Sequence, residues 1–201
     1  AAVDAVSLPD PGVPTQGLDG EPLLTLLPLG EAASAQPLAQ TDERGVSVSA
    51  PLGQTPATAT ATGPLAPALA SQVTVTAAGQ RTSGLASTPC VEPEREWWFV
   101  AGSGQVGRRA TLVLGNAADG AAVVDVEVWT ENGLLSTSGT NDLGVPARGS
   151  RTVAIDAVAN GAERLAVRVS ASVGKVGAAL VVRDVQGANP IGLSWAMPSE
   201  E

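Results

Sequence analysis

The sequence predicts an all-β protein: an antiparallel, immunoglobulin-like β-sandwich preceded by a low-complexity or partly β N-terminal segment. Three observations predict it. From about residue 84 onward, short stretches alternate apolar and polar residues. Clusters of Gly, Asn, Asp and Pro separate these stretches, and none of them keeps helical periodicity over three turns. Short strands with turn signals at this spacing are typical of a sandwich, with a barrel as the less favoured alternative.

The alternation predicts seven or eight strands in this part of the chain. It is clearest around Val124, Val126 and Val128, which share one face, while Asp125 and Trp129 fall on the other. Asn132-Gly133 follows as a signal for a tight hairpin turn. The expected strands lie at residues 96–100, 109–114, 122–130, 134–137, 150–156, 165–171, 176–183 and 191–195.

The first seventy residues differ in composition. Residues 51–70 read PLGQTPATATATGPLAPALA, an Ala/Thr/Pro segment of the kind that forms extended, solvated linkers. We therefore divide the chain into residues 1–70, a Pro/Ala/Thr-rich stalk or a degenerate β segment, and residues 71–201, the β-sandwich domain. Residues 23–29 and 72–76 are the strand candidates that favour the second description of the N-terminal segment.

Composition excludes several function classes. The chain has 201 residues, no histidine, one cysteine and a net charge of −9. It therefore has no histidine-based triad, no imidazole metal ligand and no cysteine cluster for zinc or iron–sulfur. The acidic balance argues against nucleic-acid binding, which needs clustered Lys and Arg. We expect no cofactor, no metal and no catalytic residue.

No apolar run is long enough to span a bilayer, and the chain begins without Met. We interpret it as a mature chain or fragment, and expect any membrane attachment to come from an N-terminal anchor outside it.

The aromatic residues are the candidate binding groups. On a strand, Trp97 and Phe99 share one face and Trp98 takes the other, so one face enters the core. An outward Trp98 could stack on a sugar ring, with Glu96 accepting hydroxyl hydrogen bonds, or could anchor a protein partner. Trp129 is expected outward as well, either packed across strands or as a second interaction point.

The loop after this strand reads Gly102-x-Gly104-x-x-Gly107. It opens no helix and belongs to no βαβ unit, so its glycines are expected at turn positions rather than around a dinucleotide. We include Gly102 and Gly104 among the candidate partner-binding residues because the loop lies at one end of the sandwich. Cys90 has acidic neighbours and no base, so a free, buried or intermolecularly paired thiol is expected.

Residues 84–90 (GLASTPC) followed by residues 96–102 (EWWFVAG) resemble a group of exported actinobacterial cell-envelope proteins classified only as a domain of unknown function. The resemblance continues through Leu112–Asn116 and Ala122–Val128 and covers roughly residues 80–196. It implies immunoglobulin-like β domains outside the cell, an N-terminal membrane anchor and no enzymatic activity. Relatives also carry a second cysteine in the N-terminal region. The comparable stretch here, residues 26–30, has none, which implies that Cys90 has lost its partner.

These observations predict a non-catalytic, secreted or cell-envelope β-sandwich with a structural or adhesive role, contacting an envelope protein or a glycan. A carbohydrate-binding module using exposed Trp is the alternative, and an accessory domain of an uncharacterised enzyme is the third possibility. The candidate partner-binding residues are Trp98, Trp129, Glu96, Gly102 and Gly104.

Overall fold

The computed structural model describes residues 1–9, 18–30, 36–53, 55–79, 82–135, 139–187 and 189–199. Within these ranges the protein is all-β, with antiparallel strands in four sheets. The described residues also include the 3-10 helix η2 (Gly63–Ala68) and the short helix α1 (Ile155–Val158). In the ranges described, no helix is long and apolar enough to cross a membrane.

The chain divides into two compact units. Unit 1 comprises Ala1–Val75 and Ser87–Cys90, and unit 2 comprises Thr76–Ala86 together with the chain from Val91 onward. The sequence-based boundary at residue 70 falls inside β6 (Leu69–Gly79), a single strand that contributes to both units. Alternation along a strand shows which side chains share a face. It does not show that β6 pairs with β1 only over Leu69–Thr74, so the sequence could not place the boundary between the units within this strand.

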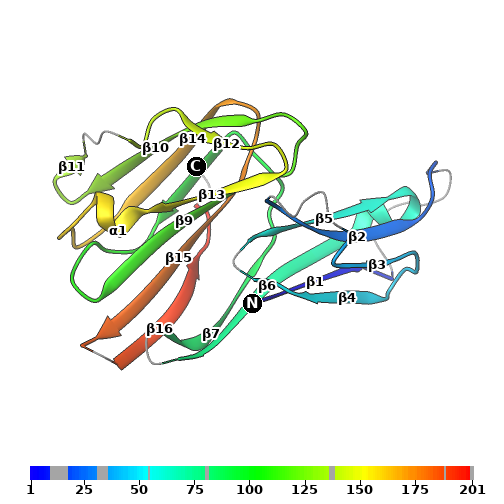
Figure 1. Cartoon of the computed structure of the whole chain (residues 1–201), viewed down its shortest axis with the longest axis horizontal. Helices are drawn as coiled ribbons and strands as arrows, with labels where there is room; N and C mark the ends of the chain where they lie inside the picture. Colours follow the sequence, from blue (N-terminus) through cyan, green and yellow to red (C-terminus); the bar gives the residue numbers. More distant parts are fainter. Residues whose placement is uncertain are drawn as a thin grey trace. The chain divides into compact units, whose positions relative to one another are not determined.

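Unit 1 contains two sheets, with strand orders β4-β1-β6-β7 and β3-β2-β5. The strands of the first sheet are β4 (Ser47–Pro51), β1 (Ala2–Ser7), β6 (Leu69–Gly79) and β7 (Thr82–Pro89). Those of the second are β3 (Ala39–Thr41), β2 (Leu23–Pro28) and β5 (Ala57–Thr62). Figure 1 shows these strands in colours from blue (β1) through cyan to blue-green (β7).

The two sheets of unit 1 share a buried core. Its fully buried members include Val3, Leu24, Leu26 and Leu65. The described residues of the segment that composition suggested as a solvated stalk thus form β1 to β5 and the beginning of β6. Its apolar side chains are sparse but alternate, so a thin core of Val, Leu and Ala is sufficient to bring the strands together.

Unit 2 also contains two sheets (Figure 1). The first, which we call sheet I, has the order β11-β10-β14-β8, with β12 also paired to β10; the second, sheet II, has the order β13-β9-β15-β16. Sheet I consists of β8 (Glu96–Val100), β10 (Ala122–Thr130), β11 (Gly133–Leu134), β12 (Leu143–Val145) and β14 (Ala166–Val173). Sheet II consists of β9 (Arg108–Asn116), β13 (Gly149–Ala154), β15 (Gly177–Gln186) and β16 (Asn189–Ala196).

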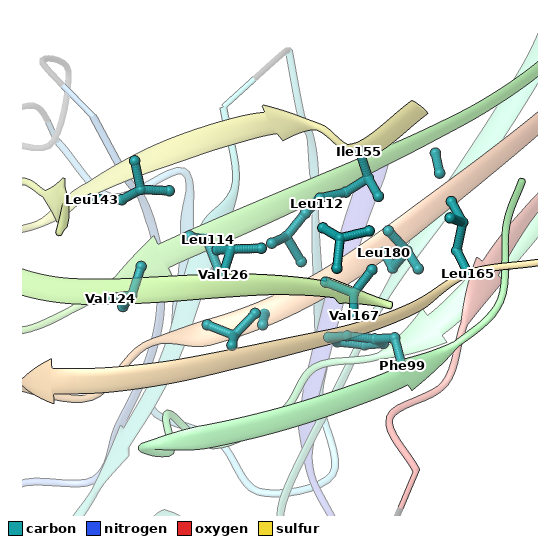
Figure 2. Packing of buried hydrophobic residues seen from close by; sticks show 14 of the residues in the cluster. Phe99, Leu112, Leu114, Val124, Val126, Leu143, Ile155, Leu165, Val167 and Leu180 are labelled. Atoms are coloured by element: carbon teal, nitrogen blue, oxygen red, sulfur yellow. The ribbon is translucent and has the colours of Figure 1, made fainter. Parts of the chain in front are cut away.

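Side chains from both sheets of unit 2 meet in one core. Leu112 and Leu180 come from sheet II, whereas Phe99, Val126 and Val167 come from sheet I, and all are at most 1% exposed. Figure 2 shows them pointing toward one another between the strands. Burial alternates along β10 as the sequence predicts, so residues on the opposite parity of that strand form the outer face of sheet I.

Two local expectations differ from the structure. The strand expected at residues 150–156 ends at Ala154, and Ile155 begins α1, where it is fully buried in the core. At the hairpin turn, Gly133 has a positive φ of 102°, but Asn132 does not. The strand expected to follow includes Ser136 and Thr137, which lie outside the described residues.

The hairpin end of β6 and β7 belongs to unit 2. A Cβ on Gly84 would lie 3.5 Å from the backbone nitrogen of Leu193, so this part of β7 lies close against β16. Leu193 and Val181 are at most 9% exposed although Val181 points away from the core shared by the two sheets. The outer side of sheet II is therefore partly covered, whereas sheet I presents an outer face with exposed apolar residues.

Candidate functional site

The outer face of sheet I carries two aromatic residues, the half-buried Trp98 and Trp129, which is 37% exposed. The register pairs Trp98 of β8 with Arg168 of β14, and Arg168 with Glu127 of β10. Trp129 lies two residues beyond Glu127 on β10, so it points to the same side as Trp98. We call this surface the tryptophan face. It consists of Glu96, Trp98, Val100, Asp125, Glu127, Trp129, Leu134, Ala166, Arg168 and Ser170.

One row across the tryptophan face is apolar. Leu134 pairs with Trp129, Trp129 with Ala166, and Ala166 with Val100. Their exposed fractions are 50% for Leu134, 37% for Trp129 and 71% for Val100. Four neighbouring strands thus place apolar side chains side by side in solvent. This arrangement is typical of an interaction surface rather than of apolar residues exposed singly.

The next row carries an ion network. Arg168 Nε donates to Glu96 Oε1 at 2.6 Å, and Arg168 Nη1 donates to Glu127 Oε2 at 3.3 Å. The guanidinium carbon of Arg168 lies 5.5 Å from the centroid of the Trp98 ring, and Trp98 Nε1 donates to Glu96 Oε1 at 3.2 Å. Trp98 therefore has a cation on its ring and a carboxylate at its ring nitrogen, which together restrict its rotamer.

The network also sets the electrostatics of the face. The hydrogen bond from Arg168 is the main reason that the pKa of Glu96 lies below its usual range. The hydrogen bonds that Arg168 donates, first to Glu96 and then to Glu127, raise the pKa of Arg168. These shifts favour the charged forms of both Glu96 and Arg168.

The third row is polar and acidic. Asp125 pairs with Ser170, and Ser170 with Glu96. Asp125 Oδ1 accepts a hydrogen bond from the backbone nitrogen of Asp142 at 2.7 Å, which ties the loop before β12 to this row. The tryptophan face thus passes from apolar through mixed to acidic over a few residues along each strand.

The partners of Trp98 and Trp129 were not evident from the sequence. Arg168, Val100 and Leu134 come from positions that the strand pattern marks as outward, but only strand pairing shows that they adjoin the tryptophans. Knowledge of which strands are neighbours in the sheet, and in what register, would have identified these residues as partners of the two tryptophans. Alternation by itself gives the face of a residue and leaves its cross-strand partner open.

Trp97 and Phe99 lie on the inner side of β8. Phe99 is fully buried, and Trp97 packs against the core while its Nε1 donates to the backbone oxygen of Val176 at 2.8 Å. Trp195, the fourth tryptophan, lies on β16, and its Nε1 has no hydrogen-bond partner among the described residues. These rings serve packing rather than the tryptophan face.

The glycine loop is held against the rest of unit 2. Gly104 N donates to the oxygen of Ala162, and Gly161 N donates to the oxygen of Gly104, both at 2.9 Å. A Cβ on Gly104 would overlap Ala159 O, and one on Gly102 would lie 3.0 Å from the Cβ of Ala110. Both candidate glycines thus allow close backbone packing, and Gly104 is buried rather than offered to a partner.

The carboxylates of Glu94 and of Glu96, the first residue of β8, bind different cations. Glu94 Oε2 accepts from Lys175 Nζ at 3.0 Å, while Glu96 binds Arg168. Arg168 and Lys175 are thus the cations paired with these two carboxylates. No group of three or more Cys, Asp and Glu side chains in the described ranges could hold a metal ion.

Cys90 is half-buried in unit 1, where it packs against the core of that unit. Burial raises the pKa of its thiol, and a hydrogen bond with Ser71 offsets part of this effect. A thiol in such surroundings is a weak nucleophile, because the thiolate is the reactive form.

Comparison with known proteins places the chain in a family. No curated protein matches the sequence. The crystal structure of Thermotoga maritima 1070 is 17% identical over 55% of this chain and 97% of that one, with a TM-score of 0.44. The structure of infectious bursal disease virus, Gx strain, is 10% identical over 90% of this chain and 55% of that one, with a TM-score of 0.23. At these TM-scores neither likeness supports an argument about fold or function.

The model of a family of unknown function, DUF5719, matches residues 38–201. The match spans most of the chain and covers every residue of the tryptophan face. The chain therefore belongs to the DUF5719 family.

Proposed function

We propose that this protein is a non-catalytic adhesive or structural module, secreted or held in the cell envelope, that contacts another protein through the tryptophan face. The observation that carries the proposal is the row formed by Leu134, Trp129, Ala166 and Val100, in which apolar side chains from four adjacent strands are in register and three are more than a third exposed. Exposed tryptophan beside aliphatic residues is a frequent anchor of protein interfaces.

The envelope location rests on the resemblance of residues 84–102 to exported actinobacterial proteins. In this proposal, membrane attachment comes from a segment outside the chain, and no nucleic acid takes part because the protein is acidic. The proposal assigns the protein no reaction and no cofactor.

We also propose that unit 2 is an immunoglobulin-like sandwich. In that fold, the second strand lies beside the fifth in one sheet, while the third lies beside the sixth in the other. In unit 2, β9 and β13 correspond to the second and fifth strands and lie side by side in sheet II. Likewise β10 and β14 correspond to the third and sixth strands and lie side by side in sheet I. The outer positions differ from the immunoglobulin pattern, since the early strand β8 flanks β14 and the late strand β15 flanks β9.

Photo-crosslinking tests the protein-contact proposal. A photoreactive side chain placed at Val100, which is 71% exposed on the tryptophan face, should crosslink a discrete protein partner in intact cells. The same group placed at Ile191, which is 64% exposed on β16 of sheet II, is the matched control. Equal products from both positions, or none from Val100, would contradict the proposal.

A carbohydrate-binding module is the second candidate. It is favoured by the position of Trp98 and Trp129 on one face, with the Glu96 and Glu127 carboxylates available to accept hydroxyl hydrogen bonds. Purified cell-wall polysaccharide should then change the tryptophan fluorescence of the native protein. The change should be lost in a Trp129→Ser variant and kept in a Trp195→Phe variant, whose ring belongs to sheet II.

A further inference from the structure

We propose that the partner segment on the tryptophan face is an extended polypeptide in which basic side chains accompany apolar ones. The basic groups bind the carboxylates of Glu96, Glu127 and Asp125, while the apolar groups cover Trp129 and Val100. The inference rests on the proposed function and deepens it by naming the chemistry of the partner.

The first step is the charge of the face. Three carboxylates, on Asp125, Glu127 and Glu96, lie on the outer side of β10 and β8, against a single guanidinium on β14. The face thus has a net charge of −2, from one positive and three negative groups, and the whole chain has a net charge of −9. A basic segment is attracted to such a surface both at long range and on contact.

The second step is what the face already binds. Arg168 shows the chemistry within the chain itself: its guanidinium bridges two carboxylates and lies 5.5 Å from the centroid of the Trp98 ring. These contacts use one oxygen of each carboxylate, Glu96 Oε1 and Glu127 Oε2. A carboxylate has about four acceptor positions, so a second cationic group can bind beside Arg168.

The third step is spacing. Along β10, the apolar position Trp129 is followed by Glu127 and then Asp125 at intervals of two residues, about 7 Å each in an extended strand. An extended partner also presents side chains to one side at intervals of about 7 Å. An apolar residue with a basic residue two or four positions away therefore matches successive rows of the face.

The alternatives fit less well. A second copy of the chain would bring its own net charge of −9 to a surface that is already negative. An acidic glycan meets the same repulsion. A neutral glycan would stack on tryptophan, but it would leave the aliphatic side chains of Val100 and Leu134 without matching groups.

Two blocked nonapeptides test the inference on the full chain. In one, leucine and lysine alternate with serine; in the other, glutamate replaces lysine. Dissociation constants are measured by fluorescence anisotropy at about 0.02 M and about 0.5 M NaCl, because salt screens exposed charges. We expect the lysine peptide to bind at least about tenfold more tightly at low salt and to lose most of this advantage at high salt.

Variants separate the contributions. A Glu96→Gln/Glu127→Gln double variant should weaken the lysine peptide about tenfold, whereas Asp42→Asn/Glu43→Gln, which removes the same charge from an exposed turn of unit 1, should not. Val100→Ser should weaken both peptides, and Leu85→Ser, at a position 70% exposed on β7, should weaken neither. Tryptophan fluorescence and circular dichroism of each variant confirm that it is folded.

Each other outcome overturns the inference in a recognisable way. Equal binding of both peptides, lost in Val100→Ser, leaves the proposed protein contact intact and removes the preference for basic partners. An equal loss in the two charge variants shows non-specific attraction. Displacement of the peptide by a neutral polysaccharide identifies a glycan as the occupant. Absence of binding by either peptide rejects the inference, while crosslinking at Val100 still tests the proposed function separately.

Discussion

Arg168 lies over the ring of Trp98, and both side chains donate to the same carboxylate oxygen, Glu96 Oε1. The tryptophan predicted to point outward is thus held by two neighbours on its own sheet. Its orientation is set before any partner arrives, which reduces the entropy lost on binding.

Removing Arg168 should raise the pKa of Glu96. The hydrogen bond from Arg168 is the first cause of the lowered pKa, so an Arg168→Gln variant should return it toward the ordinary range for glutamate. An NMR titration of the Glu96 side-chain carboxyl carbon measures the change. Glu131, whose pKa is lowered by backbone hydrogen bonds from Glu131 and Glu163, is the internal control and should not move.

The same pair gives a pH dependence of stability. Because the folded-state pKa of Glu96 is depressed, its contribution is present above the unfolded pKa, near 4.5, and is lost as the pH falls through the folded value. The stability difference between wild type and Arg168→Gln should therefore be constant near neutral pH and shrink in acid. Urea unfolding at a series of pH values checks this, and a difference that grows toward acid pH would contradict it.

Gly104→Ala should destabilise unit 2 by about 1–3 kcal/mol, because the added Cβ overlaps Ala159 O and the backbone must move. Gly120→Ala is the matched control, since a Cβ there meets nothing within 4 Å and its φ is not in the left-handed region. The control should be neutral or stabilising by up to about 1 kcal/mol. Thermal unfolding of both variants decides the point; an equal effect would show that the loop is not packed as described.

Phe99→Ala should cost about 3–5 kcal/mol, because Phe99 is fully buried between the sheets of unit 2 and its removal leaves a cavity. The neighbouring Val100→Ala changes a side chain that is 71% exposed and should cost less than about 0.5 kcal/mol. Both free energies of unfolding can be measured in urea. Similar costs at the two positions would contradict the burial of Phe99, and a larger cost for Val100→Ala would show that the faces of β8 are reversed.

Cys90 should react slowly with a thiol reagent in the native protein. Burial raises its pKa, so the thiolate fraction near pH 8 is small and access is limited. Following 5,5′-dithiobis(2-nitrobenzoate) with and without denaturing urea gives the comparison. A native rate equal to the unfolded rate would show that the thiol is not packed in the core of unit 1.

Much of unit 2 could be predicted from the sequence, because its buried positions alternate. Val124, Val126 and Val128 mark the inner face of β10 without reference to any other strand, and the matching outward positions include Trp129. The pairing of Trp98 with Arg168 could not be predicted in this way. It depends on which strands become neighbours, and that depends on chain connections far apart in the sequence.

Unit 1 was harder to predict for a different reason. Its strands are rich in Ala, Thr and Pro, a composition shared by solvated linkers and by strands with a thin core. The deciding groups are a few leucines, such as Leu24 and Leu26 on β2, whose burial requires the partner sheet. Local pattern alone does not contain that information.

The allocation of β6 and β7 to both units has a consequence for folding and for dissection of the protein. The chain passes from one unit to the other after Val75, after Ala86 and again after Cys90. No single cut therefore yields two complete halves: cleavage at residue 70 would separate β1 from most of β6, one of the two strands that pair with it. Residues 76–86, the hairpin end of β6 and β7, belong to unit 2, whereas the residues on both sides of them belong to unit 1. Unfolding of unit 1 would therefore release both ends of this hairpin. We expect the two units to unfold in a single cooperative transition rather than independently.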